Sequence, residues 1–300
     1  MDSYKTQDLP LPGSPVVPQM LDGTKVIQFR CHKGIACWNA CCSNIDISLT
    51  PYDILRLKGR FGMSSGEFLQ KYTAPYEMEQ GGIVGVKLRP VEGGTACPFM
   101  TAEGCSVYED RPTACRYYPV ALLSMRRQGE STDSNSYALV KEAHCLGHRE
   151  PRQITIDEYR DEQGLAEYDE LARGWRQLIL KKKSSGPTVG KPSGRSLQLF
   201  FMACYDIDRF REFVASDGFN DLYDLPAEEM QEILLDDTRL MLFGFRFLKQ
   251  VLFGEMTIPV RKEGQDKRLK RYQDKVQRME HEAAVKRAGE QDSMYEHIDD

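Results

Sequence analysis

Residues 97–119 read CPFMTAEGCSVYEDRPTACRYYP, and this stretch decides how the first half of the chain folds. It holds three cysteines within nineteen residues, interrupted or followed by a glycine and two prolines: Cys97, Gly104, Cys105, Pro112, Cys115 and Pro119. Glycine and proline at such positions favour turns over a long helix or strand. Because turns can aim several thiolates at one point, the stretch predicts a metal site.

Further cysteines lie on both sides of this stretch, so that eight of the nine cysteines precede residue 150. The thiolate is a soft ligand that suits zinc, iron–sulfur clusters and copper(I). Eight thiolates are enough for two four-thiolate sites. We therefore expect metal binding by the whole set: Cys31, Cys37, Cys41, Cys42, Cys97, Cys105, Cys115 and Cys145.

The spacing of the cysteines matches neither the paired C-x2-C turns of common zinc modules nor the runs of bacterial ferredoxins. The pair Cys41-Cys42 is informative, because successive side chains usually diverge. Either the two thiols bind different metals, or one of them lies beside the metal ligands without binding the metal. Three histidines beside cysteines are alternative ligands, although a role as polar neighbours is the simpler interpretation: His32, His144 and His148.

Composition and charge narrow the function classes. The chain has 300 residues, 41% of them hydrophobic and 28% charged, which is ordinary for a soluble globular protein. A net charge of -5 gives no general case for binding nucleic acid or an anionic membrane.

We recognise no secretory signal or membrane span, so we expect a reducing, cytoplasmic compartment, where clustered cysteines hold metal more often than they form disulfides. Disulfides and buried free thiols are the weaker alternatives, except for Cys204, which we expect to be buried in a helix.

Residues 25–150 resemble the YkgJ-like cysteine-cluster family of zinc- or iron-chelating proteins. The resemblance lies in Phe29-x-Cys31 with the Cys-Cys pair, in Cys97-Pro-Phe-Met, and in Gly104-Cys105-Ser-Val-Tyr108, Arg111-Pro112 and Cys115-Arg116-x-Tyr118-Pro119. The first cluster of that family is usually close to C-x2-C-x2-C-C, whereas the gaps here are five and three residues. The resemblance implies zinc or iron as the cofactor, with an iron–sulfur cluster as an open alternative.

A related family, the flagellin lysine N-methylases, has a similar C-R-x-Y-P ending. This similarity implies an alternative function, an iron–sulfur enzyme such as a protein lysine N-methyltransferase. No residue of the sequence is identified as catalytic. A third hypothesis is an interaction module, in which structural zinc supports a protein-binding surface on the helical half.

The other residues of the 97–119 stretch suggest supporting roles. Arg111 and Arg116 would neutralise the excess negative charge of a tetrathiolate site, or would pair with Glu109 and Asp110. Backbone N–H groups near Gly104 would donate to sulfur and so tune the metal. We expect three tyrosines to pack around the cluster: Tyr108, Tyr117 and Tyr118.

The predicted fold class is α+β: a metal-stapled cysteine-cluster domain with short strands and helices, followed by a mainly helical region. We expect a flexible proline-rich arm at 1–24, the cysteine-cluster domain at 25–150, a helical region at 151–255 with a linker near 184–195, and a charged helical or disordered tail at 256–300. Short strands are predicted at 25–30, 44–49 and 83–89. Residues 126–136 are loop-like, and residues 136–143 form a strand or a short helix.

Several helix starts are visible as capping patterns. Thr50 precedes Pro51 and Asp53, and Ser64 precedes Glu67 by three residues, a capping box for a short helix through Tyr72. Thr155 to Glu158 caps a helix that we expect to run to about residue 183. Further helices are predicted at 196–215 and 226–253.

The tail is rich in charge. Residues 261–288 contain ten Lys and Arg against five Asp and Glu, a net charge of +5. Acidic residues are interleaved and aromatic residues are scarce, so we favour a solvated or protein-docked helix over a nucleic-acid site. Five residues follow a heptad spacing over two repeats: Leu269, Tyr272, Val276, Met279 and Ala283.

Overall fold

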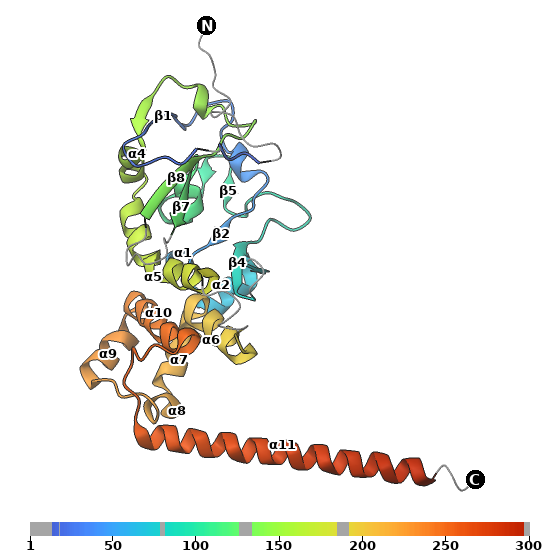
Figure 1. Cartoon of the computed structure of the whole chain (residues 1–300). Coiled ribbons are helices and arrows are strands. Elements are labelled where there is room, and N and C mark those ends of the chain that lie inside the picture. The colour runs from blue at the N-terminus through green and yellow to red at the C-terminus, as the bar shows by residue number, and fades with distance from the viewer. Residues whose placement is uncertain (1–13, 18, 79–81, 126–133, 185–191, 297–300) are drawn as a thin grey trace.

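The computed structural model describes residues 14–17, 19–78, 82–125, 134–184 and 192–296. It has the predicted α+β fold, with small sheets at one end of the molecule and helices in the middle and at the opposite end (Figure 1). After β9 (Gln153–Thr155) the described elements are all helices, apart from an isolated bridge between Tyr223 and Val260.

The sheets of the described part are antiparallel and have two or three strands each. They pair β1 (Val26–Gln28) with β9; β4 (Val84–Leu88) with both β2 (Ser48–Leu49) and β3 (Thr73–Glu77); β5 (Met100–Thr101) with β6 (Gly104–Cys105); and β7 (Val120–Met125) with β8 (Ser134–Leu139). The strands predicted within 25–30, 44–49 and 83–89 are confirmed as β1, β2 and β4.

The β7–β8 hairpin corrects the prediction for its region. Residues 126–133 of the predicted loop lie outside the described residues, but residues 134–136 belong to β8 and are not loop. The ambiguous segment 136–143 is a strand as far as Leu139, because it pairs along β7, with Leu122 opposite Tyr137. The strand β7 itself was not predicted.

Part of the expected flexible arm is attached to this hairpin. Residues 1–13 and 18 lie outside the described residues. Val17 N–H donates to Leu139 O (2.8 Å), and Leu21 exchanges two backbone hydrogen bonds of 2.8 Å with Tyr137. Val17 and Leu21 are buried, so these residues of the segment are anchored to the sheet rather than extended as a free arm.

The short helices of the cysteine-rich half begin where the capping patterns predict. Thr50 forms a complete capping box with Asp53 at the start of α1 (Pro51–Phe61), and Ser64 forms one with Glu67 at the start of α2 (Ser65–Tyr72). Further along are α3 (Thr113–Tyr117) and the 3₁₀ helices η2 (Ala40–Cys42), η3 (Tyr108–Asp110) and η4 (Gly147–Arg149).

Each of the three long helices predicted after residue 155 is divided in two. The first becomes α4 (Ile156–Glu162) and α5 (Leu165–Ser184), because Gly164 adopts a left-handed φ of 63° that a helix cannot continue through. The second becomes α6 (Gly194–Tyr205) and α7 (Ile207–Ala215), and the third becomes α9 (Ala227–Leu235) and α10 (Asp237–Phe253). Asp206 and Asp236 lie at these two breaks with non-helical backbone angles, and the Asp236 side chain caps α10 by accepting from Arg239 N–H.

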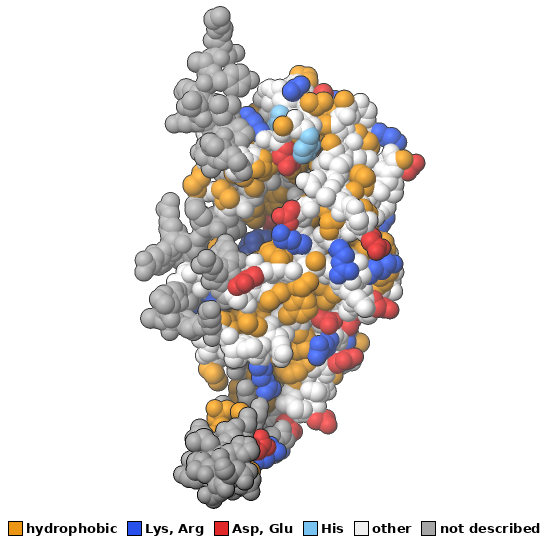
Figure 2. Space-filling model, turned by 90° about the vertical axis from the view of Figure 1, so that its right-hand side faces the viewer, with side chains coloured by type: hydrophobic (Ala, Val, Ile, Leu, Met, Phe, Trp, Pro, Cys, Tyr) orange, Lys and Arg blue, Asp and Glu red, His pale blue; other side chains and the backbone are white. Residues whose placement is uncertain are grey.

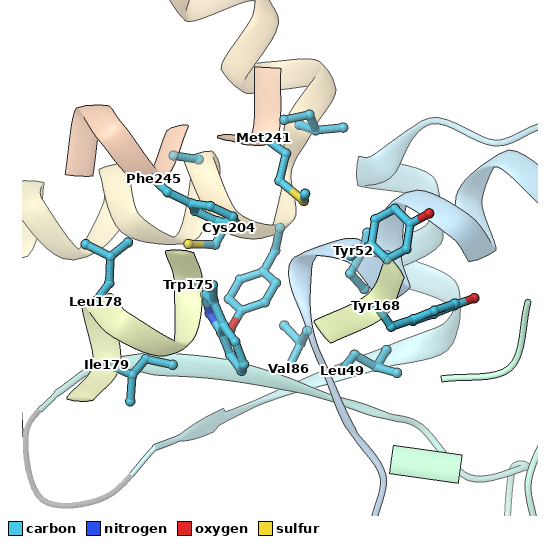
Figure 3. Packing of buried hydrophobic residues seen from close by; sticks show 14 of the residues in the cluster. Leu49, Tyr52, Val86, Tyr168, Trp175, Leu178, Ile179, Cys204, Met241 and Phe245 are labelled. Atoms are coloured by element: carbon cyan, nitrogen blue, oxygen red, sulfur yellow. The ribbon is translucent and has the colours of Figure 1, made fainter. Parts of the chain in front are cut away.

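The helical half packs directly on the cysteine-rich half. Trp175 of α5 lies between Val86 of the sheet β2-β4-β3 and the side chains of Cys204 (α6) and Phe245 (α10) (Figure 3). Cys204 is only 3% exposed among these side chains, which confirms its predicted burial. The small helix α8 (Asp217–Asn220) joins this core through Phe219.

The charged tail is α11 (Lys262–Glu296), a helix that points away from the other elements (Figure 1). Arg261 N–H donates to Leu222 O (2.9 Å) at its start. Leu269, Tyr272 and Met279 of the heptad spacing are exposed. Among the described residues, no helix combines the length and the apolar character needed to cross a bilayer.

Candidate metal centre

The first cysteine segment follows β1 and begins beside the segment that carries Cys145. Arg30 N–H donates to Gly147 O at 3.1 Å, directly before Cys31. Further on, η2 presents the adjacent pair Cys41 and Cys42, whose sulfurs are 3.9 Å apart. A 3₁₀ turn separates successive side chains by about 120°, so the two thiols leave the backbone on different sides.

The second segment folds back on the first through a backbone hydrogen bond. Cys97 N–H donates to Cys42 O at 2.7 Å, which ties the start of the second segment to the adjacent pair. The hairpin β5–β6 then places Cys105 opposite Met100. The hairpin therefore returns the chain to the neighbourhood of Cys97.

Cys115 lies in α3, and α3 is tied to α1 by the buried carboxylate of Asp53. One oxygen of Asp53 accepts from the N–H (2.8 Å) and the hydroxyl (2.7 Å) of Thr113. The other oxygen accepts from Thr50 N–H (2.8 Å). Asp53, which completes the capping box of α1, therefore also fixes the start of α3 and the position of Cys115.

Cys145 lies between β8 and η4, next to Cys37. Leu146 N–H donates to Cys37 Sγ at 3.3 Å, a contact between segments 109 residues apart in the sequence. The Tyr118 hydroxyl is close by: burial raises its pKa, and the neighbouring Cys145 and Glu142 raise it further.

All eight predicted ligands are thus brought into one region, and their mutual electrostatic effects divide them. Burial, and then the charges of Cys41, Cys37 and Cys145, raises the pKa of Cys31 to about 11. Burial, with contributions from Cys97 and Cys105, raises the pKa of Cys115. We call Cys31, Cys37 and Cys145 the outer group, and Cys42, Cys97, Cys105 and Cys115 the inner group. Cys41 lies beside both.

The adjacent pair is coupled through its two sulfur atoms. The hydrogen bond with Cys42 lowers the pKa of Cys41 to about 7 and raises the pKa of Cys42. Cys31 and Cys41 are exposed, whereas the other six thiols are partly buried. Cys41 is therefore an accessible thiol whose contact with Cys42 favours its ionisation.

Backbone N–H groups assist the inner thiols, as predicted from the sequence. Burial raises the pKa of Cys97 and of Cys105, but hydrogen bonds from backbone amides oppose this rise. The donors are Phe99 and Met100 for Cys97, and Val107 for Cys105. Such N–H groups stabilise thiolate charge and tune a metal that the thiolates hold.

Arginine side chains bring positive charge to the thiols. Asp110 pairs with Arg56 and Arg60, not with Arg111 or Arg116. Burial raises the pKa of Cys105, and the charges of Arg111 and Arg60 lower it; Arg111 also acts on Cys31. Arg111 is therefore close enough to influence both groups.

The two motif arginines are buried without a carboxylate partner among the described residues. Arg111 donates to Tyr108 O (2.8 Å) and to the side chain of Gln163. Arg116 donates to Gln163 O (2.7 Å) and to the Tyr168 hydroxyl (3.0 Å). The alternative of pairing with the carboxylates of Glu109 and Asp110 is wrong, and the positive charge of Arg111 acts on Cys31 and Cys105.

The histidines are occupied by other groups. His32 and His144 each lie 3.5 Å from a glutamate, Glu150 and Glu142 respectively. The Nε2 atom of His148 is 2.9 Å from Val140 O. Figure 2 shows histidine side chains at the surface of the cysteine-rich end. These contacts favour polar neighbours over ligands.

The eight thiols lie in one region but do not form a closed metal site. In the described part of the chain, no three Cys, His, Asp or Glu side chains lie close enough to hold one metal ion as they stand. A closed site therefore requires the thiol side chains to turn toward one another. The backbone segments that carry them are already adjacent.

One buried hydrogen-bond donor of the first cysteine segment, Trp38 Nε1, has no partner among the described residues. Trp38 follows Cys37, and a Cβ at Gly104, which has a φ of 125°, would lie 3.1 Å from its ring. Thiolate sulfur is the acceptor that such donors need, so the residues present fit a thiolate-bound metal. Trp38 was not predicted as part of the site, and its position directly after Cys37 was the available signal.

The tyrosines of the 97–119 stretch differ in their surroundings. Tyr117 is buried and donates to Asp169 (2.6 Å), in keeping with its predicted packing. Tyr108 is 52% exposed, with the Arg111 guanidinium 4.0 Å from its ring centroid, so the packing prediction is wrong for this residue.

Comparison with known proteins bears on the cysteine-rich half only. No curated protein and no solved structure matches the chain. Residues 30–146 match the model of the CxxCxxCC family, described as "Putative zinc- or iron-chelating domain". The match includes the eight predicted ligands. Cys204 and the helical half lie outside it. The resemblance to a cysteine-cluster family is thereby confirmed for residues 30–146, which form a domain of the zinc- or iron-chelating class.

Proposed function

We propose that this domain chelates zinc or iron through eight thiolates, those of Cys31, Cys37, Cys41, Cys42, Cys97, Cys105, Cys115 and Cys145. The observation that carries the proposal is that segments far apart in the sequence bring these thiols into one region. Cys204, in contrast, is buried among aromatic side chains of the helical half.

The charges around the thiols support this function. Four thiolates around one divalent cation carry a net charge of about −2, which is costly to bury without compensation. Arg111 is buried, pairs with no carboxylate among the described residues and acts on Cys31 and Cys105, and Arg60 also acts on Cys105. Their guanidinium groups would offset the excess negative charge of the loaded site.

The elements that carry several of the cysteines are very short. The strands β5 and β6 have two residues each, and η2 has three. A bound metal would cross-link these turns and so contribute directly to folding. We therefore propose a structural contribution of the metal in addition to chelation.

The test is the metal content of the full chain purified without oxygen. We expect zinc or iron at a fixed ratio to protein, and the Cys204→Ala variant should hold the same amount. Cys97→Ala, which removes an inner thiol, should lose metal, whereas Cys204→Ala should not. Protein that is folded, fully reduced and free of metal would contradict the proposal.

The same sample addresses the iron–sulfur alternative. Iron with acid-labile sulfide and a broad charge-transfer absorption would favour an iron–sulfur protein and would justify a search for an enzymatic substrate. Colourless protein with zinc would count against an iron–sulfur enzyme, including a lysine N-methyltransferase. It would leave the chelating function in place.

A further inference from the structure

The adjacent cysteines of η2 raise the question of how many sites the eight thiols form. Their sulfurs are 3.9 Å apart. Two thiolates on one tetrahedral zinc would have a similar separation, about 3.8 Å for Zn–S bonds of about 2.3 Å. The distance between Cys41 and Cys42 therefore does not decide whether they share a metal, and the answer must come from what surrounds each of them.

We propose that the eight cysteines form two four-thiol metal sites that divide the adjacent pair, and that the outer site releases its metal before the inner site. The outer site consists of Cys31, Cys37, Cys41 and Cys145. The inner site consists of Cys42, Cys97, Cys105 and Cys115. This inference rests on the proposed metal-binding function and adds the number, membership and order of release of the sites.

The backbone assigns three thiols to each site before the pair is considered. Leu146 N–H donates to Cys37 Sγ, and Arg30 N–H donates to Gly147 O, so Cys31, Cys37 and Cys145 meet at one place. The inner site is built separately by the β5–β6 hairpin, which brings Cys105 toward Cys97, and by the Asp53–Thr113 hydrogen bonds, which fix α3 and Cys115.

One member of the adjacent pair is tied to the inner site by its own backbone. Cys42 O accepts from Cys97 N–H at 2.7 Å, so Cys42 completes a set of four with the hairpin and α3. The outer set then has three thiols, and Cys41 is the remaining one. Because Cys41 lies at a different angle around the 3₁₀ turn, it can turn toward the outer set while Cys42 faces inward.

The electrostatic effects separate the two sets at every cysteine except Cys41. The cysteines that act on Cys31 are Cys41, Cys37 and Cys145, which are the other members of the proposed outer site. Cys97 and Cys105 act on Cys115 within the proposed inner site. Cys41 also acts on these three inner thiols, so it is assigned by the backbone and not by charge. Arg111 acts on both Cys31 and Cys105, and one guanidinium can do so only where the two sites are close together.

Exposure gives the order of release. Cys31 and Cys41 are exposed, whereas no member of the proposed inner site is. A chelator in solution has direct access to the outer thiolates, and the inner thiolates are shielded by the hairpin and α3. We therefore expect the outer metal to leave first.

The experiment uses the full chain, reconstituted with zinc without oxygen, and two variants of the adjacent pair, Cys41→Ala and Cys42→Ala. The unaltered chain should hold about two zinc ions, and each variant about one. Alkylation followed by peptide mass spectrometry identifies which thiols the remaining zinc protects. Cys41→Ala should leave the inner thiols protected and make Cys31, Cys37 and Cys145 reactive, whereas Cys42→Ala should do the reverse.

Cys204→Ala is the matched control, because it removes a thiol outside both sites and should retain two zinc ions. If Cys42→Ala fails to fold, Cys41→Ala alone decides between the arrangements. One zinc per unaltered chain, or loss of protection from all eight thiols in Cys41→Ala, would overturn the division into two sites. A metal-free unaltered chain would instead overturn the proposed function itself.

The order of release is tested on the unaltered, zinc-loaded chain by adding a chelator and an alkylating reagent together. We expect two phases, with the outer thiols labelled in the first and the inner thiols in the second. Simultaneous labelling of all eight thiols, or earlier labelling of the inner ones, would contradict the proposed order.

Discussion

The chain uses cysteine in two regions for opposite purposes. Eight cysteines lie on turns and short elements of the cysteine-rich half, where their thiols are at least partly accessible and have arginine neighbours. Cys204 lies in the long helix α6, 3% exposed and surrounded by apolar side chains. Burial with apolar neighbours suits a thiol to packing, whereas turns with nearby cations suit it to metal binding.

The two regions also differ in what stabilises them. The helical half has a dense aromatic core, in which Phe210, Phe219 and Phe247 are almost fully buried. The ring centroid of Phe247 lies 5.9 Å from that of Phe210 and 6.1 Å from that of Phe219. The turns that carry the cysteines have strands of only two residues. One region should therefore depend on packing and the other on metal.

Removing the metal should give the largest difference between the regions. A structural zinc site contributes on the order of 10 kcal/mol to folding, so the cysteine-bearing turns should lose order when the metal is stripped. Hydrogen exchange before and after chelation should show loss of protection around residues 97–115, with α6 and α10 retained. Equal loss of protection in α6 and α10 would remove the distinction between the regions.

A large-to-small change in the aromatic core should act in the opposite way. Phe247 is 1% exposed, and Phe247→Ala should lower the free energy of unfolding by about 4 kcal/mol because it leaves a cavity. Zinc or iron content at low temperature should not change. Leu242→Ala is the control on the same helix, because Leu242 is 41% exposed and should cost much less. A fall in metal content in Phe247→Ala would show that the two regions are coupled.

A smaller effect is expected from Asp110, which joins α1 to η3. Burial raises its pKa, but hydrogen bonds from Arg60 and Arg56 outweigh burial and leave the pKa below its ordinary value of 3.8. A lowered pKa in the folded state means that the stabilisation is present above pH 3.8 and is lost as the pH falls through the folded pKa.

The measurement is the free energy of unfolding of Asp110→Asn and of the unaltered chain, followed as a function of pH. We expect Asp110→Asn to be less stable by about 1 kcal/mol at neutral pH. The difference should shrink below pH 3.8, where the carboxylate is protonated. A difference that does not depend on pH would show that the charge of Asp110 contributes nothing.

The smallest effect should come from Cys204→Ala. Loss of one buried sulfur atom should cost about 1 kcal/mol, and metal content should be unchanged. Thermal unfolding and metal analysis of the same preparation provide the check. Any loss of metal from this variant would break the contrast between Cys204 and the other eight cysteines.

The sequence was sufficient to find the cysteines, the capped starts of α1 and α2, and the burial of Cys204, because these depend on local pattern. It was not sufficient to divide the long helices. Apolar spacing continues across Asp206 and Asp236 as if each helix were whole. Asp236 makes a local cap of α10, whereas Asp206 makes a contact with a distant helix. Asp206 accepts a hydrogen bond from Ser65 of α2 (2.7 Å).

The sequence identifies the candidate thiols but not the contacts made by the residues around them. The acidic residues nearest to Arg111 in the sequence are Glu109 and Asp110, yet Asp110 is taken by Arg56 and Arg60 from α1. Long-range competition of this kind leaves no local signal. For the same reason, the grouping of Cys37 with Cys145 could not be read from a spacing of more than one hundred residues.

The break at Gly164 has a chemical consequence. In an uninterrupted helix, the carbonyl of Gln163 would be used by the amide four residues later. Because the helix stops there, this carbonyl is free to accept the Arg116 guanidinium, and the Gln163 side chain accepts Arg111. The elbow between α4 and α5 thus supplies hydrogen-bond acceptors for Arg111 and Arg116. One residue of this elbow therefore links both motif arginines of the cysteine-rich half to the entrance of the helical half.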